Sequence, residues 1–522
     1  MSPSPSEMRT LAPVRTPFHS ILFDEPPPDV RAEPPSFADL NLGQVVEAIM
    51  AGRQEYDLTP FFYLPLHTVD AVAYRQAVFR DLERSEVAGA VAQFATTMRA
   101  VRAGLEQAAK LHYPRQQESW FLDTAELYGE AVGSFVRDLD RAELASRGLR
   151  SFREFLSAYA ANSGFTGLVA QTRGLKSDLA EVRYTLHFRG GRIKVSRYDG
   201  EADHGAEVLA TFDRFKQGAV KDYRVNLSTG GEMNHVEAGV VDLVALLYPE
   251  PFAGLTAFRA RHHDFLDPTI AAFDREVQFY LAVLEFVAHL ERAGLEFCYP
   301  QVSADSKEVF ARDTFDIALA NKLVHGPTPV VRNDIFLQGS ERIIVVSGPN
   351  QGGKTTFARM FAQLHYVAAL GCLVPGREAR LFLFDRLFTH FEREENLQDL
   401  VGKLQDELLR IHSILEQATP RSIIIMNEIF TSTSLQDAIF LGSRVLEKII
   451  ALDALCVCVT FVDELTRLGE STVSMVSTVL PDDPTVRTFT IARRPADGLS
   501  YAVAIADKYR LGYAALTERI PR

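Results

Sequence analysis

The residues between positions 348 and 356 have types and spacing that suit phosphate chemistry. They match the pattern G-x-x-x-x-G-K-[ST] at every fixed position, and they are Gly348, Pro349, Asn350, Gln351, Gly352, Gly353, Lys354, Thr355 and Thr356. Glycines let backbone N–H groups close around phosphates, a lysine ammonium bridges the terminal phosphates, and a threonine hydroxyl is a ligand for Mg²⁺. The segment therefore predicts a nucleotide site, with ATP and Mg²⁺ as its cofactors.

The flanks of this motif supply the elements that such a loop needs. The apolar run ERIIVVS precedes it and is typical of a buried strand, and TFARMFAQLHYVAAL follows it with helical character. A helix that begins directly after the glycines directs its N-terminal N–H groups at the phosphates. The order strand, loop, helix agrees with the chemistry that the residue types suggest.

A second strand is predicted to bring a carboxylate to the same site. Glu428 follows the apolar run SIIIM, 74 residues after Lys354, and is placed to orient or deprotonate an attacking water. Asn427 precedes it at the position where an Asp usually assists Mg²⁺. Its amide oxygen can accept a hydrogen bond from a Mg²⁺-bound water, but it contributes no charge.

The distribution of residue types along the chain predicts three parts. Residues 1–36 are rich in proline and form a lead-in, and residues 37–325 form a mainly helical core and lever domain. A small β-containing insertion is expected at about residues 181–226 within that domain. Residues 326–522 alternate short apolar runs with helical stretches, which indicates an α/β P-loop ATPase domain around a parallel sheet.

Composition bounds the class of protein. The chain has 522 residues with a formal charge of −13, so a contact with a polyanion requires a local basic surface. No stretch of about 18 apolar residues occurs, the N-terminus lacks the residue order of a signal peptide, and the four cysteines lack metal-ligand spacing. These features predict a cytoplasmic protein that does not bind a membrane.

The motif and several flanking segments together resemble the MutS family. SGPNQGGKTT resembles the MutS phosphate loop, and NEIFTSTSLQDA resembles the family's Walker B strand with the loop that follows it. LVPGREARLFLFDRLFTHFE, ILEQAT and the late segment SYAVAIADKYRL are similar to other parts of the same domain, so that the resemblance covers residues 330–506 well. TVDAVAYRQAVFRDLE, at residues 68–83, is similar to the start of the family's core domain.

The resemblance implies an ATPase of the ABC class that acts as a dimer. In such a dimer each nucleotide lies between one subunit's phosphate loop and a serine-bearing segment of the other. Here that segment falls at residues 396–407, where Gly402 and Lys403 stand in place of the serine-threonine pair, so that Lys403 is a candidate donor in trans. Residues 330–336 are expected to contact the adenine.

A further departure from the family concerns the sensing of the terminal phosphate. The family's strand ends in Ala-Thr-His, and here Phe461 stands at the histidine position. By resemblance, that histidine senses the γ-phosphate, which a phenyl ring cannot do. Together with Asn427, this substitution predicts slow or altered hydrolysis.

Contact with DNA is expected from the insertion, where the family places its clamp. The segment VRYTLHFRGGRIKV alternates apolar and polar residues on both sides of a Gly-Gly pair, which indicates a β-hairpin. Residues 189–197 carry four basic side chains and no acidic one: Arg189, Arg192, Lys194 and Arg197. They could lie on phosphates without reading base sequence, although a solvated strand face explains them equally well.

Two functions of different classes fit these features. The first is an ATP-dependent DNA-binding protein of repair or recombination, in which ATP binding and hydrolysis gate a dimeric clamp without the family's N-terminal mismatch-recognition domain. The second is an ATP-gated protein-interaction switch with weak hydrolysis and no direct mismatch recognition. In both, a homodimer is expected, and a partner protein from DNA repair is possible.

Overall fold

The computed structural model describes residues 18–25, 32–201, 233–392, 402–483 and 485–496, together with residues 511, 516 and 517. The described part divides into two compact units. The first unit comprises Phe18, Arg84–Leu144 and the described part of Arg150–Asp274, and the second comprises the described parts of His19–Glu83, Ala145–Leu149 and Arg275–Arg522. The limits of these two units differ from the predicted domains at residues 1–36, 37–325 and 326–522. Those domains remain a prediction.

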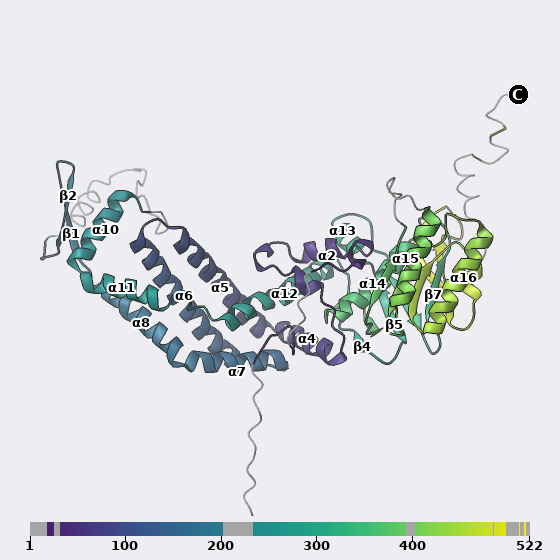
Figure 1. Cartoon of the computed structure of the whole chain (residues 1–522), viewed down its shortest axis with the longest axis horizontal. Coiled ribbons are helices and arrows are strands. Elements are labelled where there is room, and N and C mark those ends of the chain that lie inside the picture. The colour runs from purple at the N-terminus through teal and green to yellow at the C-terminus, as the bar shows by residue number, and fades with distance from the viewer. Residues whose placement is uncertain are drawn as a thin grey trace, which may run out of the picture. The chain divides into compact units, whose positions relative to one another are not determined.

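Helices dominate the first unit, as the helical periodicity predicts (Figure 1). In chain order they are α5 (Ser85–Lys110), α6 (Pro114–Arg141), α7 (Arg147–Ala161), α8 (Ser163–Ala180), α10 (His235–Leu247), α11 (Pro249–Arg261) and α12 (Pro268–Glu291). Aromatic side chains fill the core between them. The rings of Phe94 and Phe135 stack with their centroids 4.3 Å apart, and those of Phe152 and Phe273 stack at 3.6 Å.

The predicted hairpin is confirmed in this unit. Strands β1 (Tyr184–Arg189) and β2 (Arg192–Arg197) pair antiparallel, with Arg189 opposite Arg192 at the turn. Gly190 and Gly191 connect them with φ of 56° and 76°. Both residues of such a tight turn lie in the left-handed region, which explains the Gly-Gly pair.

The second unit is built on a six-stranded sheet in the order β10-β11-β12-β7-β13-β14. The strands are β7 (Ile343–Ser347), β10 (Leu387–His390), β11 (Ile423–Asn427), β12 (Leu455–Val459), β13 (Thr472–Val479) and β14 (Arg487–Arg493). All neighbouring pairs are parallel except β13 with β14, which is antiparallel. The predicted strands at residues 343–347, 422–426 and 454–461 thus correspond to β7, β11 and β12, and the unit is mixed α/β.

Two smaller sheets accompany the large one, and the sequence patterns did not indicate them. A four-stranded sheet has the order β4-β9-β5-β6, and β3 pairs with β8. The strands are β3 (Phe297–Cys298), β4 (Gln301–Ser303), β5 (Val309–Thr314), β6 (Asn333–Leu337), β8 (Val374–Pro375) and β9 (Glu378–Phe382). Strands of two or three residues are too short for their periodicity to be recognised.

Helices cover the sheets of the second unit and extend to its N-terminal segments (Figure 1). They are α1 (Ser36–Asp39), α2 (Leu42–Ile49), α3 (Thr59–Phe62), α4 (Val69–Leu82), α13 (Ile317–Leu323), α14 (Lys354–Ala369), α15 (Lys403–Gln417) and α16 (Leu435–Leu452), with 3₁₀ turns η1 (Gln54–Tyr56) and η2 (Asp463–Arg467). The C-terminal part of α12, from Arg275 onward, belongs to this unit as well.

Helix α14 is the most enclosed of these helices, and polar side chains connect it to distant parts of the chain. Gln363 donates to the Leu40 carbonyl at 2.9 Å, and the Tyr366 hydroxyl donates to the Phe62 carbonyl at 2.9 Å. Arg359 pairs with the buried Asp316 at 3.0 Å. The bonds of Gln363 and Tyr366 span 323 and 304 residues, so they hold the helix that begins with Lys354 against segments from far earlier in the chain.

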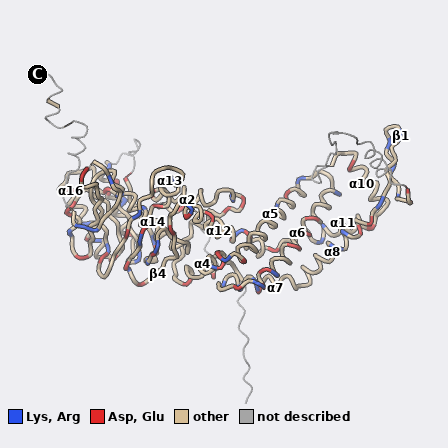
Figure 2. The backbone as a smooth tube through the Cα atoms, turned by 180° about the vertical axis from the view of Figure 1, so that it is seen from behind, with Lys and Arg blue, Asp and Glu red and all other residues tan. Residues whose placement is uncertain are grey.

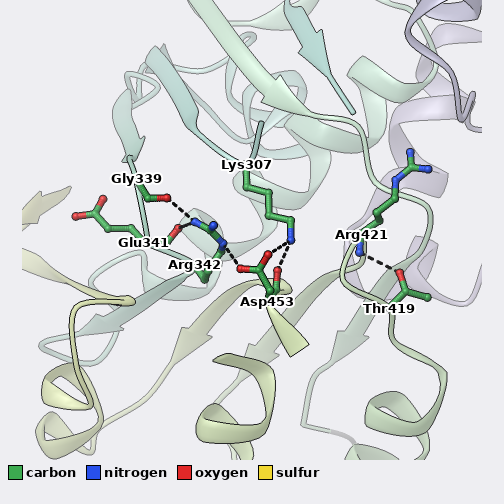
Figure 3. A network of polar contacts seen from close by, with 7 residues as sticks. All are labelled: Lys307, Gly339, Glu341, Arg342, Thr419, Arg421 and Asp453. Atoms are coloured by element: carbon green, nitrogen blue, oxygen red, sulfur yellow. Dashed lines mark hydrogen bonds and ion pairs between the residues drawn. The ribbon is translucent and has the colours of Figure 1, made fainter. Parts of the chain in front are cut away.

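An acidic residue at the end of α16 holds the start of strand β7 (Figure 3). Asp453 adopts φ of 60° as the C-cap of α16, and its carboxylate accepts from Arg342 Nε at 2.6 Å and from Lys307 Nζ at 2.5 Å. Burial opposes ionisation, but the hydrogen bonds from Lys307 and Arg342 outweigh it, so the pKa of Asp453 is lowered. The charged form therefore anchors the residue that directly precedes β7.

Two expectations from composition can be compared with the structure. All four cysteines are free, and Cys456 and Cys458 are fully buried in β12, as the apolar run around them predicts. Within the described ranges no single helix is long and apolar enough to cross a membrane. The pair α10 and α11, bent by 109°, reaches that length and composition together.

A partly buried carboxyl group lies where α12 meets residues 20–23. Glu276 Oε2 accepts from the backbone N–H of Ile21 at 2.9 Å. Burial raises the pKa of Glu276 to about 7, although the hydrogen bonds from Ser20 and Ile21 and the cations Arg75 and Arg275 act in the opposite direction. Burial likewise raises the pKa of the neighbouring Tyr74 and Tyr280 hydroxyls, so that both stay neutral near pH 7.

Because Glu276 retains its proton in the folded state, we expect the free energy of unfolding to depend on pH. Because its folded pKa of about 7 exceeds the ordinary 4.5, the folded state retains a proton that the unfolded state has lost between these values. The contribution is fully present below pH 4.5 and is lost as pH rises through 7, for a total of up to about 3 kcal/mol.

Urea unfolding followed by circular dichroism from pH 4.5 to 8 measures this dependence. We expect Glu276→Gln to flatten the decline in stability that the wild-type chain shows over this range. The exposed-residue control Glu47→Gln should retain the wild-type slope. Identical pH profiles for Glu276→Gln and the wild type would contradict the assignment.

Candidate functional site

The loop between β7 and α14 closes on itself through unusual backbone angles. Gly348, Gln351 and Gly353 have φ of 113°, 58° and 87°, in the region that favours glycine. Gly353 is the residue that precedes α14, so the first N–H groups of that helix face the loop. The predicted sequence of strand, glycine loop and helix is therefore present, with Asn350 and Gln351 exposed and Pro349 buried.

Strand β13 presses against this loop through Ser477, a residue that the sequence patterns did not single out. A Cβ atom at Gly352 would lie 2.2 Å from Ser477 Oγ, and one at Gly348 would lie 3.0 Å from the Ser477 backbone N and O. The fully buried Ser477 hydroxyl donates to the Gly352 carbonyl at 2.7 Å. The two glycines thus permit a close approach of backbone that fixes the loop on the sheet.

Lys354 is almost completely buried at the centre of the loop. Its ammonium donates to the carbonyls of Gly348 at 3.0 Å and Pro349 at 3.1 Å, and it lies 4.5 Å from the centre of the Phe461 ring. Burial lowers the pKa of Lys354, Glu428 opposes the shift and Arg487 adds to it. The ammonium is directed into the loop, where a bound anion would replace the carbonyl contacts.

The two residues predicted to assist Mg²⁺ lie in direct contact. The Thr355 hydroxyl donates to Asn427 Oδ1 at 2.8 Å. Thr355 is in the first turn of α14 and Asn427 ends β11, which is separated from β7 by β12. Both side chains offer neutral oxygen ligands, a donor set that suits Mg²⁺ only with phosphate oxygens and water added.

Glu428 follows Asn427 in a strained backbone conformation. Its φ of 56° is rare for a residue with a side chain, and its N–H donates to the Val459 carbonyl at 2.9 Å. Burial raises the pKa of the Glu428 carboxyl, Lys354 lowers it and Glu392 raises it further. A strained backbone beside a carboxyl group whose raised pKa responds to the charge of the loop lysine is typical of a functional position.

The turn after Glu428 rests on a buried glutamate of α15. Glu407 Oε1 accepts from the Phe430 N–H at 2.7 Å and lies 3.4 Å from His390 Nε2. Phe430 also has a positive φ, of 59°, so Glu407 stabilises a second strained residue of the same turn. Glu407 thereby holds the backbone that presents Glu428.

The segment expected to act in trans is only partly described. Residues 396–401 lie outside the described residues, as do residues 500–510 of the late segment that resembles the family. Gly402 precedes α15, and Lys403 pairs with Glu392 at 2.5 Å within the same chain. The role of Lys403 in trans stays a prediction.

Two aromatic residues border the loop. Phe461 is 46% exposed and lies over the Lys354 ammonium, where the resemblance expects a histidine. Phe489 of β14 is 48% exposed, adopts φ of 60°, and its side chain would lie 3.6 Å from a Cβ atom placed at Gly353. The Phe489 carbonyl accepts from Asn333 Nδ2 at 3.3 Å, so β6, in the segment expected near adenine, borders this edge.

The basic residues of the hairpin divide between its two faces. Arg189 pairs with Arg192 and His187 with Lys194, so strand alternation places Arg189, Arg192 and Lys194 on one face. Figure 2 shows Lys and Arg positions in blue along the backbone, including the hairpin that begins at β1. Arg197 lies opposite Tyr184 on the other face. Its Nε donates to the Leu247 carbonyl at 3.2 Å and its guanidinium lies 5.0 Å from the Tyr248 ring centre.

The structure therefore unites three of the four predicted DNA residues and assigns Arg197 a contact with α10 and the residue after it. Four further basic residues of the insertion, Arg214, Lys216, Lys221 and Arg224, lie outside the described residues.

Comparison with known proteins identifies the domain that contains the loop. The family model of MutS domain V matches residues 344–511, from β7 through the loop, α14 and the sheet to the C-terminal segment. This region is therefore a MutS domain V, which is the ATPase domain of MutS proteins.

Curated relatives agree with the family model. A "DNA mismatch repair protein MutS" from Granulibacter bethesdensis is 27% identical over 327 residues, which cover 59% of this chain and 34% of the relative. Proteins of the same name from Shouchella clausii and Oleidesulfovibrio alaskensis are 37% and 36% identical over 142 and 126 residues, which cover 27% and 24% of this chain and 16% and 14% of those relatives. The C-terminal region of the chain is thus similar to MutS proteins, and the chain's matches span about a third or less of the length of these relatives.

The contact between Gly352 and Ser477 predicts a specific effect on stability. Gly352→Ala places a methyl group 2.2 Å from Ser477 Oγ, so we expect a loss of about 1 to 3 kcal/mol through overpacking. Adding Ser477→Ala removes the oxygen and should restore part of that loss. Chemical unfolding of the single and double variants measures both effects.

The cycle needs a control because Ser477→Ala also loses its bond to the Gly352 carbonyl. The single variant Ser477→Ala should be destabilised by about 1 kcal/mol. If the two substitutions simply add, the proposed contact is wrong; the contact requires that the double variant be more stable than the sum predicts.

Proposed function

We propose that the chain is a Mg²⁺-dependent ATPase of the P-loop ABC class that binds DNA, and that ATP binding and hydrolysis gate a homodimeric clamp in DNA repair or recombination. The observation that carries the proposal is the buried Lys354 ammonium within a glycine loop that only glycines can close, next to the bonded pair Thr355 and Asn427. The similarity of residues 344–511 to MutS domain V supports it.

The residues fit an ATP complex in specific ways. The phosphates take the place of the two carbonyls at the Lys354 ammonium and receive the N–H groups at the start of α14. Mg²⁺, when bound, neutralises charge on the phosphates. Thr355 offers it a hydroxyl, and Asn427 orients a water of its shell.

Glu428 is the proposed general base for the attacking water. Its raised pKa favours proton acceptance over that of an ordinary surface carboxylate. The neutral Asn427 leaves Glu428 as the only acidic residue of this strand end, and Phe461 offers no hydrogen bond to a terminal phosphate. These two side chains support slow turnover.

Exposed apolar residues support assembly of two chains at this site. Leu435 and Phe440, at the start of α16, are 64% and 60% exposed, close in sequence to the turn that presents Glu428. Phe461 and Phe489 add exposed rings at the loop. Apolar side chains around a nucleotide site suit a dimer in which the partner covers the nucleotide.

Steady-state ATP hydrolysis tests the nucleotide site. We expect Lys354→Ala to weaken ATP binding and reduce turnover at least about 100-fold, because it removes the cation that stabilises the transferred phosphate. Glu428→Gln should retain binding, measured with a fluorescent ATP analogue, and lose turnover about 10²-fold or more. Turnover per chain should rise with protein concentration if a dimer completes the site.

Two matched results decide between the alternatives. The exposed control Glu416→Gln on α15 should match the wild type. Binding of ATP without hydrolysis and without any response to duplex DNA would favour the protein-interaction switch. Absence of ATP binding by the wild-type chain would exclude both.

The basic face of the hairpin supports a contact with the DNA backbone. Arg189, Arg192 and Lys194 share that face, and residues 189–197 contain no acidic side chain. Arginine and lysine on an exposed strand pair bind phosphates without reading base sequence. No base-specific role is proposed for the hairpin.

Duplex binding as a function of salt tests this face. We expect the triple variant Arg189→Ala/Arg192→Ala/Lys194→Ala to bind more weakly and to reduce the slope of log affinity against log salt by up to roughly 2.7, about 0.9 for each lost contact. The matched variant Arg197→Ala removes a basic residue of the other face and should leave the slope unchanged. Equal slopes for the wild type and triple variant would exclude the hairpin as a DNA contact.

A further inference from the structure

A short segment near the N-terminus, bent at Ile21 and Leu22, is buried in the second unit without belonging to any sheet. Ser20, Ile21, Leu22 and Phe23 are only 7%, 0%, 1% and 8% exposed. No helix or strand of the described residues includes them. Because buried backbone groups require hydrogen-bond partners, these residues must obtain them from elsewhere.

The Ser20 hydroxyl accepts from the N–H groups of Leu22 at 2.9 Å and Phe23 at 3.1 Å, and side chains of two helices supply the other partners. The hydroxyl of Tyr74 donates to the Ser20 carbonyl at 2.7 Å, and that of Tyr280 donates to the Ile21 carbonyl at 2.5 Å. Glu276 accepts from the Ile21 N–H at 2.9 Å. Arg75 Nε donates to the Leu22 carbonyl at 3.2 Å.

Tyr74 and Arg75 belong to α4, and Glu276 and Tyr280 to α12. The four side chains contact the backbone groups of three consecutive residues, Ser20 to Leu22, which is the main-chain recognition that a peptide-binding site requires.

Aromatic side chains complete the pocket for the last residue of this segment. The Phe23 ring lies 6.4 Å from Phe61, centroid to centroid. The guanidinium carbon of Arg75 lies 4.9 Å from the Phe23 centroid and 5.4 Å from that of Phe279. The buried cation thus contacts two rings, one from the segment and one from α12.

The same arginine reaches the helix that begins with Lys354. Arg75 Nη1 donates at 2.8 Å to the carbonyl of Leu370, the C-cap residue of α14. A Cβ atom at Gly371 would lie 2.9 Å from Arg75 Cβ, so the approach is close. A cation at a helix C-terminus also opposes the partial negative charge there. One guanidinium therefore bonds the segment on one side and α14 on the other.

We infer that Tyr74, Arg75, Glu276 and Tyr280 form a peptide-binding site that the chain's own residues 20–23 occupy, and that Arg75 couples its occupancy to the C-terminal end of α14. We name residues 20–23 the strap. The coupling to nucleotide rests on the proposed function, whereas the site and its contact with α14 do not.

Burial of the arginine gives the coupling its energetic basis. Arg75 is fully buried, and its Nη2 has no hydrogen-bond partner among the described residues. Loss of the strap removes the Leu22 carbonyl and the Phe23 ring, which leaves the guanidinium with the Leu370 carbonyl as its one hydrogen-bond acceptor among the described contacts, beside the Phe279 ring. Since an underbonded buried cation is costly, the guanidinium must reorient when the strap leaves, and the end of α14 loses a partner.

Coupling of this kind is reciprocal. If a change in α14 weakens the Arg75 contact and releases the strap, then release of the strap changes the equilibrium of α14 by the same factor. Amide hydrogen exchange reports both events in one experiment, because the strap and residues 366–372 fall in separate proteolytic fragments.

The first arm of the test uses the full chain without nucleotide. Tyr74→Phe/Tyr280→Phe removes two hydroxyl donors to the strap and leaves every contact of Arg75 in place. We expect amide exchange in the strap to rise about thirtyfold, and exchange in residues 366–372 to rise severalfold. The matched control Tyr299→Phe removes a hydroxyl that bonds Glu83 and should change neither segment.

A second background tests the role of Arg75 as a positioning residue. In Arg75→Met, the same pair of Tyr→Phe substitutions should still loosen the strap but should no longer alter residues 366–372. Arg75→Lys, which can hold one carbonyl but not two, provides the same comparison if the methionine variant does not fold. An unchanged strap in the double Tyr→Phe variant overturns the site, and a loosened strap with unchanged α14 exchange overturns the coupling.

The second arm adds a nucleotide to the wild-type chain. We expect ADP with Mg²⁺, and a slowly hydrolysed ATP analogue, each to change amide exchange in the strap at least threefold relative to the nucleotide-free chain. Nucleotide binding is measured separately by fluorescence. Binding without any difference in the strap overturns nucleotide control of this site. Absence of binding overturns the proposed function, while the nucleotide-free arm still decides the strap and its contact with α14.

Discussion

The burial of helix α14 is the constraint on which the rest of the second unit depends. Its N-terminus must face a loop that can receive phosphates, and its body is enclosed so completely that Gln363 and His365 are buried with it. A buried helix retains its position only if its polar side chains and both ends find partners. Gln363 finds the Leu40 carbonyl, and the C-terminal Leu370 carbonyl finds Arg75. Segments from residues 40 to 75 therefore support the phosphate loop, although the sequence places them nearly 300 residues away.

The electrostatics of the site follow from the same enclosure. Removing Lys354 from water lowers its pKa, and removing Glu428 from water raises the pKa of that carboxyl, so each shift reduces the charge of the pair in the absence of ligand. Each group also opposes the shift of the other through its own charge. Phosphates that bind at Lys354 stabilise its ammonium and, by repulsion, favour the proton on Glu428 further. The neutral Asn427 does not add to that repulsion, which is consistent with a site that binds triphosphate well and hydrolyses it slowly.

The sequence allowed prediction of those features that depend on neighbouring residues. Gly348 to Thr355, the strand before them and the helix after them are local, and the Gly-Gly turn with alternating flanks is sufficient to define the hairpin. Ser477, Glu407 and Arg75 could not be found in this way, because each acts on a backbone group more than 20 residues away and none lies in a pattern of its own. The hairpin shows the same limit at a smaller scale. Alternation separates Arg197 from Arg189, Arg192 and Lys194, but only the contact with Leu247 shows that Arg197 serves the fold.

The departures from the family pattern share one physical direction. Asn427 removes a charge next to the proposed metal position, and Phe461 replaces a hydrogen-bonding ring with one that contacts Lys354 through its face. In the proposed nucleotide site, both changes would weaken the discrimination between a nucleotide with and without a terminal phosphate, while the glycine loop, held by Ser477, would still bind either. In the proposed function, the free energy that changes the protein therefore comes more from binding the nucleotide than from hydrolysing it. A bound nucleotide would contact α14 at its N-terminus, and Arg75 contacts the same helix at its other end. In the proposed coupling, the strap therefore responds to whether a nucleotide is bound.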